Sequence, residues 1–296
     1  MFMHALVQGM ILALSLGVSV VSAQDIRVEK IDLSQPLPNG PDLKVLAEVR
    51  IPKSAVKLAL VLVLPNAGGL DGTGPQYIKA LNERGIATAE LNPLADDNWI
   101  RNVMMSKIVM AQSVRNFGVD PDRIGIMGFS HGAMVSLVAS SESLMARVVR
   151  PVNLRFRAHA ALYPVCSLVY DANRASFMNW KTARPAEGGD PNFYKGMFDK
   201  MTGAKTLLLA ARNEDYEDAP TACPKLVTDM NASAPGLVDL VIYPDAGHGW
   251  DVPASRSYQD HISRKNGRIQ HTRSQSTFEQ SLTAVTDFFV RELAPR

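Results

Sequence analysis

Apolar and polar positions along the chain follow two periods that replace each other repeatedly. Short runs in which every residue is apolar, such as "ALVLVL" at 59–64, are typical of strands buried on both faces. The stretches between these runs carry apolar residues three and four positions apart, which is typical of amphipathic helices. Because such strands alternate with such helices, the pattern predicts an α/β fold with a mostly parallel central sheet and helices on both faces.

The expected elements can be placed by residue number. Buried strands are expected at 59–64, 86–91, 123–128, 158–164, 206–211 and 238–244. Helices are expected at 75–85, 100–118, 131–149, 221–233 and 276–293. Two alternating runs around a turn rich in Pro, Asn and Gly predict an antiparallel hairpin at 25–52. Neither period appears in 168–200 or 251–274, so long loops at the rim of the sheet are expected there.

The N-terminal segment, residues 1–23, contains no Asp, Glu, Lys or Arg. Its apolar stretch at 10–21 is too short to cross a bilayer comfortably, and small residues precede a cleavage position after Ala23. The segment therefore predicts a secretory signal peptide, followed by a single domain at 24–296 in a secreted or periplasmic protein. An uncleaved anchor and a buried N-terminal helix are the alternatives.

Composition narrows the class of protein further. The chain has 31 Lys and Arg against 29 Asp and Glu, so no nucleic acid and no anionic membrane is expected as a partner. Its two cysteines are Cys166 and Cys223. In an exported protein a lone pair of cysteines favours a disulfide, and two buried free thiols are the alternative. No Cys/His cluster has the spacing of a metal site.

One serine lies where an expected strand passes into an expected helix, in Gly128-Phe129-Ser130-His131-Gly132. The G-x-S-x-G spacing makes a sharp strand-to-helix turn that presents a nucleophilic serine above the sheet. The two glycines remove side chains that would clash in this turn, and the helix N-terminus points its N–H groups at the reaction centre. An ordinary loop serine is the alternative interpretation.

Two further groups follow the ends of other expected strands, where open parallel sheets bind ligands. His248 follows the last strand and is the candidate base, because a serine hydroxyl needs an imidazole to take its proton. The acid that orients the imidazole should follow the strand at 206–211. Asp215 is favoured there and Glu214 is the alternative, while Glu217 and Asp218 are expected to be solvated surface charges.

Acyl transfer also needs N–H donors for the oxyanion that forms on the substrate. One donor is expected to be the backbone N–H of His131, the residue after the serine. The second is expected in "PNAGGLDG" at 65–72, where Ala67 is favoured and Asn66 or Gly68 are the alternatives. An ordinary turn is the other interpretation of this segment.

These blocks resemble the dienelactone hydrolase family of α/β-hydrolases. The resemblance rests on "GVDPDRIGIMGFSHGAMVSL", "ALYPVC", the region after "RNEDYEDAP" and "YPDAGHGWD", and it spans about 45–293. It implies an α/β-hydrolase fold and hydrolysis of esters or lactones without a metal or cofactor. The founding enzymes use a cysteine nucleophile where this chain has a serine, so their substrate does not carry over.

The same resemblance implies roles for individual residues. The nucleophile falls on Ser130, the acid on Glu214 or Asp215 and the histidine on His248, in the chain order of an α/β-hydrolase. The paired cysteines of exported-looking relatives match the two cysteines of this chain.

The expected function is a serine hydrolase that cleaves small ester or lactone substrates through an acyl-enzyme. A serine peptidase or amidase on the same fold is one alternative. A non-catalytic binding protein that kept the fold is another.

Overall fold

The computed structural model describes the following residues: 25–36, 42–92, 94, 98–148, 154–174, 178–179, 184–185, 192–217, 220–260, 263 and 267–295. The expected signal peptide at 1–23 lies outside these ranges. Within them, no helix is both long enough and apolar enough to span a membrane.

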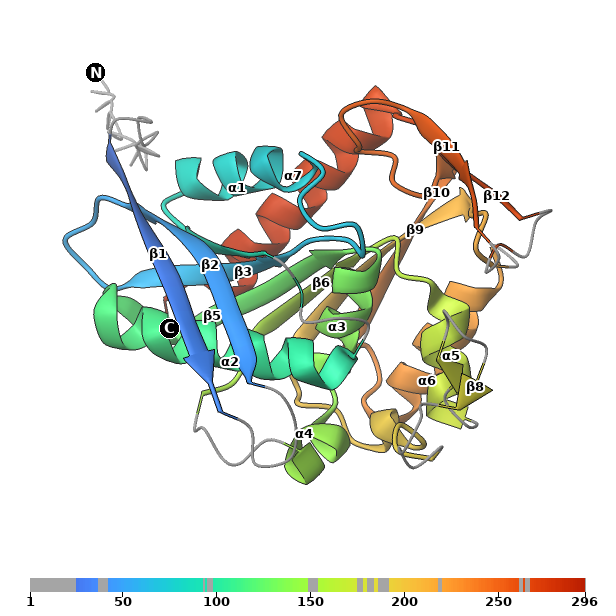
Figure 1. Cartoon of the computed structure of the whole chain (residues 1–296), viewed down its shortest axis with the longest axis horizontal. Coiled ribbons are helices and arrows are strands. Elements are labelled where there is room, and N and C mark those ends of the chain that lie inside the picture. Colours follow the sequence, from blue (N-terminus) through green and yellow to red (C-terminus); the bar gives the residue numbers. More distant parts are fainter. Residues whose placement is uncertain are drawn as a thin grey trace, which may run out of the picture.

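Eight strands form one sheet in the order β1-β2-β4-β3-β5-β6-β9-β10 (Figure 1). They are β1 (Ile26–Gln35), β2 (Leu43–Pro52), β3 (Leu58–Leu64), β4 (Ala87–Leu91), β5 (Val119–Phe129), β6 (Ala158–Leu162), β9 (Lys205–Asn213) and β10 (Val238–Gly247). Six of these strands, β4, β3, β5, β6, β9 and β10, run parallel to one another, while β1 and β2 are antiparallel additions at the edge next to β4. This confirms the α/β fold with a mostly parallel sheet.

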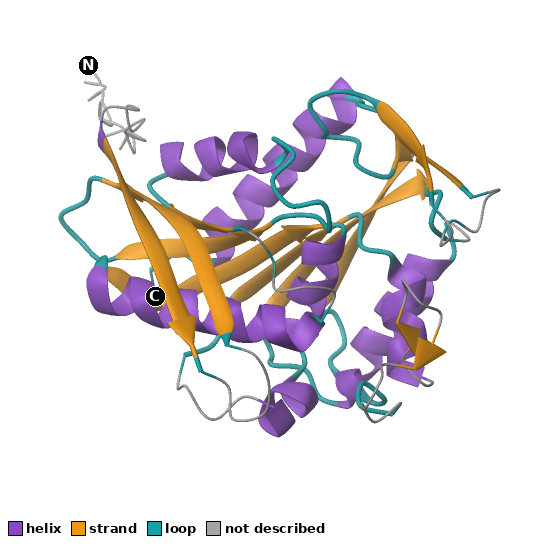
Figure 2. Cartoon of the chain, in the orientation of Figure 1, coloured by secondary structure: helices purple, strands orange, loops and turns teal. Residues whose placement is uncertain are grey.

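Helices cover both faces of the sheet (Figure 2). They are α1 (Gly74–Glu83), α2 (Trp99–Asn116), α3 (His131–Ala139), α4 (Glu142–Val148), α5 (Cys166–Arg174), α6 (Ala222–Ser233), α7 (Gln275–Glu292) and the 3-10 helix η2 (Met197–Asp199). Helices α1 and α7 pack together on one face, and α2 and α3 pack together on the other. Two small hairpins complete the fold: β7 (Met178–Asn179) with β8 (Arg184–Pro185), and β11 (Arg256–Gln259) with β12 (Arg268–His271).

Strand β3 shows why a continuous apolar run marks a central strand. Leu60 and Leu62 belong to the hydrophobic core beneath α2 and α3, whereas Val61 and Val63 belong to the core beneath α1 and α7. Successive side chains of a strand point to opposite faces, so a strand covered on both faces must be apolar at every position.

The helix expected at 131–149 is two helices, α3 and α4. Ser140 ends the first, because its Oγ donates to the carbonyl of Leu137. Ser141 begins the second, because its Oγ accepts from the N–H of Leu144. Serine hydroxyls compete for backbone hydrogen bonds in this way and interrupt helices.

The segments 168–200 and 251–274 contain elements that their lack of period did not predict. Helix α5 occupies the start of the first segment, and the hairpin β11–β12 lies within the second. All four side chains of β11 are exposed, so that strand carries no apolar alternation that a sequence pattern could reveal.

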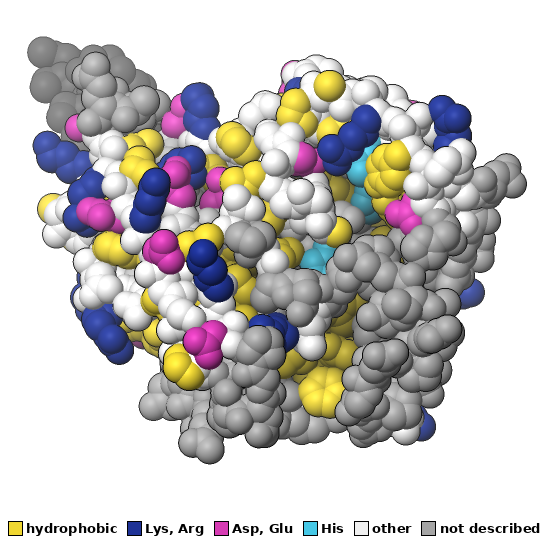
Figure 3. Space-filling view, in the orientation of Figure 1, with side chains coloured by type: hydrophobic (Ala, Val, Ile, Leu, Met, Phe, Trp, Pro, Cys, Tyr) yellow, Lys and Arg dark blue, Asp and Glu magenta, His cyan; other side chains and the backbone are white. Residues whose placement is uncertain are grey.

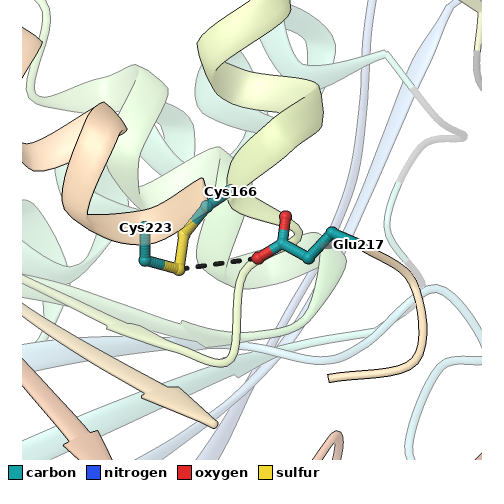
Figure 4. A group of neighbouring side chains, drawn as sticks. All are labelled: Cys166, Glu217 and Cys223. Atoms are coloured by element: carbon teal, nitrogen blue, oxygen red, sulfur yellow. Dashed lines mark hydrogen bonds between the residues drawn. A yellow bond between two sulfur atoms is a disulfide. The ribbon is translucent and has the colours of Figure 1, made fainter. Parts of the chain in front are cut away.

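A disulfide joins Cys166 at the start of α5 to Cys223 at the start of α6, as expected (Figure 4). The two cysteines are 57 residues apart, a loop whose closure stabilises the fold by about 4 kcal/mol in the chain-entropy model. The bond fixes α5 against α6 at the edge of the cavity described below.

Candidate active site

Ser130 lies in the turn between β5 and α3 with φ 49° and ψ −108°, a strained conformation for a residue with a side chain. The glycines on either side make the turn possible. A Cβ on Gly128 would come within 2.2 Å of the backbone of Gly132, and a Cβ on Gly132 within 2.5 Å of the carbonyl oxygen of Leu64. The serine is thus held at the carboxyl end of the central strand, next to the N-terminus of α3.

His248 follows the last residue of β10 and connects Ser130 to a carboxylate. Its Nε2 lies 2.9 Å from Ser130 Oγ, and its Nδ1 lies 2.7 Å from Glu214 Oε2. The imidazole and the carboxylate are both buried. An ionised carboxylate only accepts hydrogen bonds, so Nδ1 carries the proton and the lone pair of Nε2 faces the serine hydroxyl.

The carboxylate that contacts His248 belongs to Glu214 rather than to Asp215, the residue favoured from the sequence. Glu214 is buried, and its Oε1 accepts the backbone N–H groups of Asp215 and Tyr216 at 2.9 and 3.1 Å. The side chain of Asp215 turns away and accepts the N–H of Gln270 at 2.9 Å.

The two remaining acidic candidates do not alter this assignment of the contact. Glu217 is buried rather than solvated, and its Oε2 accepts the N–H of Ser167 at the start of α5 at 2.5 Å. Asp218 lies outside the described residues.

A cavity of about 120 Å³ opens beside the serine. Its lining includes Ser130 together with both residues expected to supply oxyanion donors, Ala67 and His131. The N–H of Gly68 donates to Asn66 Oδ1 at 2.8 Å, so Gly68 is engaged within its own turn. The remaining lining residues are Met134, Val165, Leu168, Tyr216, Tyr258 and Asp260.

The side chain of His131 is separate from the base. It is buried, and its Nε2 lies 3.3 Å from the amide nitrogen of Asn102 in α2. Its imidazole therefore packs under the cavity while its backbone begins α3.

The sequence also decides the family of the chain. The model of the prolyl oligopeptidase family matches residues 107–265, more than half of the chain. The chain belongs to the prolyl oligopeptidase family. The matched segment begins in α2 and ends between β11 and β12, so it contains Ser130, Glu214 and His248. No curated protein matches this family member closely enough to count as a relative.

Solved structures similar to this prolyl oligopeptidase family member share its fold at low sequence identity. A dienelactone hydrolase-like promiscuous phosphotriesterase from metagenomic libraries has a TM-score of 0.60 at 11% identity, over 90% of this chain and 98% of that one. Esterase 2 of Thermogutta terrifontis has a TM-score of 0.62 at 14% identity, over 91% of this chain and 97% of that one. A puromycin-hydrolysing peptidase of Mycobacterium tuberculosis has a TM-score of 0.59 at 15% identity, over 91% of this chain but 40% of that one. The α/β-hydrolase fold implied by the resemblance to dienelactone hydrolases is confirmed.

A buried carboxyl group lies three residues after His248, and the sequence did not predict it. Asp251 accepts hydrogen bonds from the hydroxyls of Tyr163 and Tyr77 at 2.7 and 2.8 Å. Burial raises the pKa of Asp251 to about 6, against the opposing effect of the two tyrosine hydrogen bonds. The ring of Tyr163 packs edge-on against that of His248, with centroids 5.0 Å apart, so this network supports the segment that carries the histidine.

A second histidine, His271 of β12, also lies beside His248 in this prolyl oligopeptidase family member. The two ring centroids are 5.1 Å apart. Burial, helped by the neighbouring His248 and Arg256, lowers the pKa of His271 to about 3. Figure 3 shows histidine side chains close to β10 and β11, next to a basic and a hydrophobic side chain. This contact was not predictable from the sequence, because His271 lies in a segment without a period.

One group of side chains has the spacing of a metal site among the described residues: Cys166, Glu217 and Cys223 (Figure 4). The two sulfurs are bonded to each other, so neither is a thiolate that could bind a metal ion. Glu217 Oε1 lies 3.6 Å from Cys223 Sγ, and its other oxygen accepts a backbone N–H at the start of α5. The group is a structural link between α5, α6 and the loop after β9.

Proposed function

We propose that this protein is an exported serine hydrolase that cleaves carboxylic esters or lactones through an acyl-enzyme. The observation that carries the proposal is the continuous hydrogen-bonded chain from Ser130 Oγ through His248 to the buried carboxylate of Glu214. Three residues from the ends of β5, β9 and β10 meet there in the arrangement that activates a serine.

The chemistry follows from the positions of the protons. His248 Nε2 takes the proton of Ser130 as Oγ forms a bond to the substrate carbonyl carbon. The oxyanion accepts hydrogen bonds from the backbone N–H groups of His131 and Ala67. The imidazolium, stabilised by Glu214, returns the proton to the leaving alkoxide, and the acyl group stays on the serine. A water molecule then repeats the sequence, with His248 as its base, and releases the carboxylic acid.

Ester hydrolysis is favoured over peptide hydrolysis by the extent of the structural matches. The chain spans 97% of the Thermogutta terrifontis esterase and 98% of the dienelactone hydrolase-like phosphotriesterase, but 40% of the puromycin-hydrolysing peptidase. Peptide or amide hydrolysis is the second candidate, because the matching family model describes peptidases. Rates on an ester and an anilide with the same acyl group distinguish the two.

Export to a secreted or periplasmic location is supported by two independent features. Residues 1–23 have the pattern of a signal peptide cleaved after Ala23. The disulfide between Cys166 and Cys223 is stable in the oxidising compartments outside the cytoplasm. N-terminal sequencing of the protein recovered from the periplasm or medium tests the cleavage site.

The decisive experiment replaces the nucleophile. We expect Ser130→Ala to lower kcat/KM for p-nitrophenyl esters by about 10⁴-fold or more, since the members of such a triad act as a unit. Ser54→Ala is the matched control, because Ser54 is exposed after β2, at the other end of the sheet, and its variant should keep the wild-type rate. Equal rates for Ser130→Ala and wild type would disprove the proposal.

A further inference from the structure

Two of the side chains around the cavity beside Ser130 are tyrosines. Tyr216 comes from the loop after β9 and Tyr258 from β11, and both line the cavity. Their hydroxyls are hydrogen-bonded to each other, and neither has a part in the acyl-transfer steps described above. The ring of Tyr216 also packs against that of His248, with centroids 4.6 Å apart.

A chain of hydrogen bonds behind this pair fixes where its protons lie. Arg256 Nε always carries a proton and donates to His271 Nδ1 at 3.3 Å, so Nδ1 is the bare nitrogen of the ring. His271 Nε2 then carries the proton of the neutral imidazole and donates to the hydroxyl oxygen of Tyr258 at 3.2 Å. The low pKa of His271 keeps the ring in this neutral form.

The guanidinium that sets this direction is itself held in place. Asp71 Oδ2 accepts from Arg256 at 3.0 Å and from the side-chain amide of Asn66 at 2.7 Å. Asn66 precedes Ala67, so the β11–β12 hairpin is tied to the loop expected to supply an oxyanion donor.

One phenolic hydrogen of the tyrosine pair has no acceptor within this chain of hydrogen bonds. His271 donates to Tyr258, and the bond between the two tyrosines uses one of their two phenolic hydrogens, whichever way it points. Neither hydroxyl has a further partner among the described residues. The second phenolic hydrogen is therefore available to whatever occupies the cavity. Burial raises the pKa of both tyrosines above the usual value, so the pair keeps its protons at neutral pH.

The unused phenolic hydrogen needs an oxygen with a lone pair as its partner. An ether, ketone or hydroxyl oxygen on the substrate has such a lone pair, whereas a methylene group does not.

We propose that the Tyr216–Tyr258 pair selects substrates that carry a hydrogen-bond acceptor near the scissile carbonyl, and that Arg256 and His271 set the direction of the hydrogen bonds within the pair. This specificity rests on the proposed serine hydrolase function. Plain alkyl esters are then substrates whose carbon chain leaves the phenolic hydrogen unpaired in the cavity, which lowers their transition-state stabilisation.

The experiment compares esters that differ by exchange of one methylene for oxygen. p-Nitrophenyl butyrate and p-nitrophenyl methoxyacetate are one such pair, and the oxygen is moved along the acyl chain in longer pairs. A second series carries the oxygen in the alcohol part of acetate esters. The ratio of kcat/KM, oxygen over carbon, is measured for each variant relative to wild type, which cancels the intrinsic reactivity of each ester.

We expect the ratio at one oxygen position to fall by about 3- to 10-fold in the double variant Tyr216→Phe/Tyr258→Phe, the range of a single neutral hydrogen bond. Both hydroxyls are removed because either single variant still has one unused phenolic hydrogen. Tyr170→Phe is the matched control, because Tyr170 lies on α5 outside the cavity lining and under Arg174. The proposal is overturned if the double variant lowers the rates of both members of every pair by the same factor.

Arg256→Met tests what sets the direction of the hydrogen bonds, and it leaves both tyrosines unchanged. Without the guanidinium, His271 is free to carry its proton on Nδ1, and both phenolic hydrogens can then be used within the chain. We expect the oxygen preference to fall as in the double tyrosine variant, and ¹⁵N spectra to show the His271 proton moving from Nε2 to Nδ1. An unchanged preference with an unchanged tautomer overturns the role of Arg256.

These outcomes are separable from failure of the proposed function. If Ser130→Ala keeps the wild-type rate, the hydrolase assignment fails. If hydrolysis depends on Ser130 but the oxygen preference survives removal of both tyrosine hydroxyls, only the specificity proposal fails.

Discussion

His248 and His271 are neighbours with the same side chain and opposite chemical surroundings. Their rings are 5.1 Å apart, and both are buried. Nδ1 of His248 faces the carboxylate of Glu214, whereas Nδ1 of His271 faces the guanidinium of Arg256. The first partner accepts a hydrogen bond and the second donates one, so the two imidazoles hold their protons on opposite nitrogens.

This difference decides which histidine can act as a base. In His248 the lone pair of Nε2 points at Ser130 Oγ, which has a proton to give. In His271 the same nitrogen carries a proton and points at Tyr258. The partner at Nδ1 thus assigns one imidazole to proton transfer and the other to hydrogen-bond donation, within a single cluster.

The largest expected effect separates the two histidines directly. We expect His248→Gln to lower kcat/KM by about 10⁴-fold or more, because the serine loses its base. We expect His271→Gln to lower it by less than about 10-fold, because no proton passes through that ring. Steady-state rates on one p-nitrophenyl ester measure both. Comparable losses in the two variants would contradict the division of roles.

The next effect concerns the acid behind His248. We expect Glu214→Gln to lower kcat by about 10³- to 10⁴-fold, because an amide neither fixes the tautomer nor stabilises the imidazolium. Asp215→Asn is the matched control, since its oxygen can still accept the N–H of Gln270, and it should stay close to wild type. The reverse order of the two effects would restore Asp215 as the acid.

The pH dependence of the free energy of unfolding tests the environment of His271. The titratable and charged groups around this ring are His248, Arg256, Asp71 and Tyr258. The pKa of His271 is lowered from 6.5 to about 3, so between these values the folded protein binds fewer protons than the unfolded chain. The free energy of unfolding therefore falls as pH drops below 6.5, by at most about 1.4 kcal/mol per pH unit. Urea titrations of wild type and His271→Gln should diverge over this range. Parallel curves would show that His271 is protonated freely in the fold.

Asp251 should act in the opposite direction and over a narrower range. Its pKa is raised from 3.8 to about 6, so the folded protein binds more protons than the unfolded chain in that interval. Its contribution to stability is present below pH 3.8 and is lost as pH rises to about 6, a change on the order of 3 kcal/mol. Relative to wild type, Asp251→Asn should gain stability as pH rises through this interval in urea titrations. A constant difference between the two proteins would show that Asp251 is ionised throughout.

Much of the fold follows from the sequence, because the spacing of apolar residues within a central strand or an amphipathic helix shows which of its faces are buried. The turn at Ser130 was also predictable, since the spacing of Gly128 and Gly132 reflects local backbone contacts. His248 was predictable from its place after the last strand. These features depend on residues close together in the chain.

The choice between Glu214 and Asp215 was not predictable, because neighbouring residues at a strand end differ only in the direction in which the chain turns. The cluster of Tyr216, Tyr258 and His271 was hidden for another reason. It forms across a hairpin of two four-residue strands whose positions are set by contacts distant in sequence. Its neutral histidine and paired hydroxyls form no motif of fixed spacing.

The most direct test of the account is covalent labelling with a fluorophosphonate, followed by mass mapping of the adduct. The probe reacts rapidly only with a serine whose hydroxyl is activated by a neighbouring base. The account predicts a single adduct on Ser130, retained in His271→Gln and lost or slowed by orders of magnitude in His248→Gln. An adduct on a different residue, no adduct on folded protein, or equal labelling rates in the two histidine variants would contradict it.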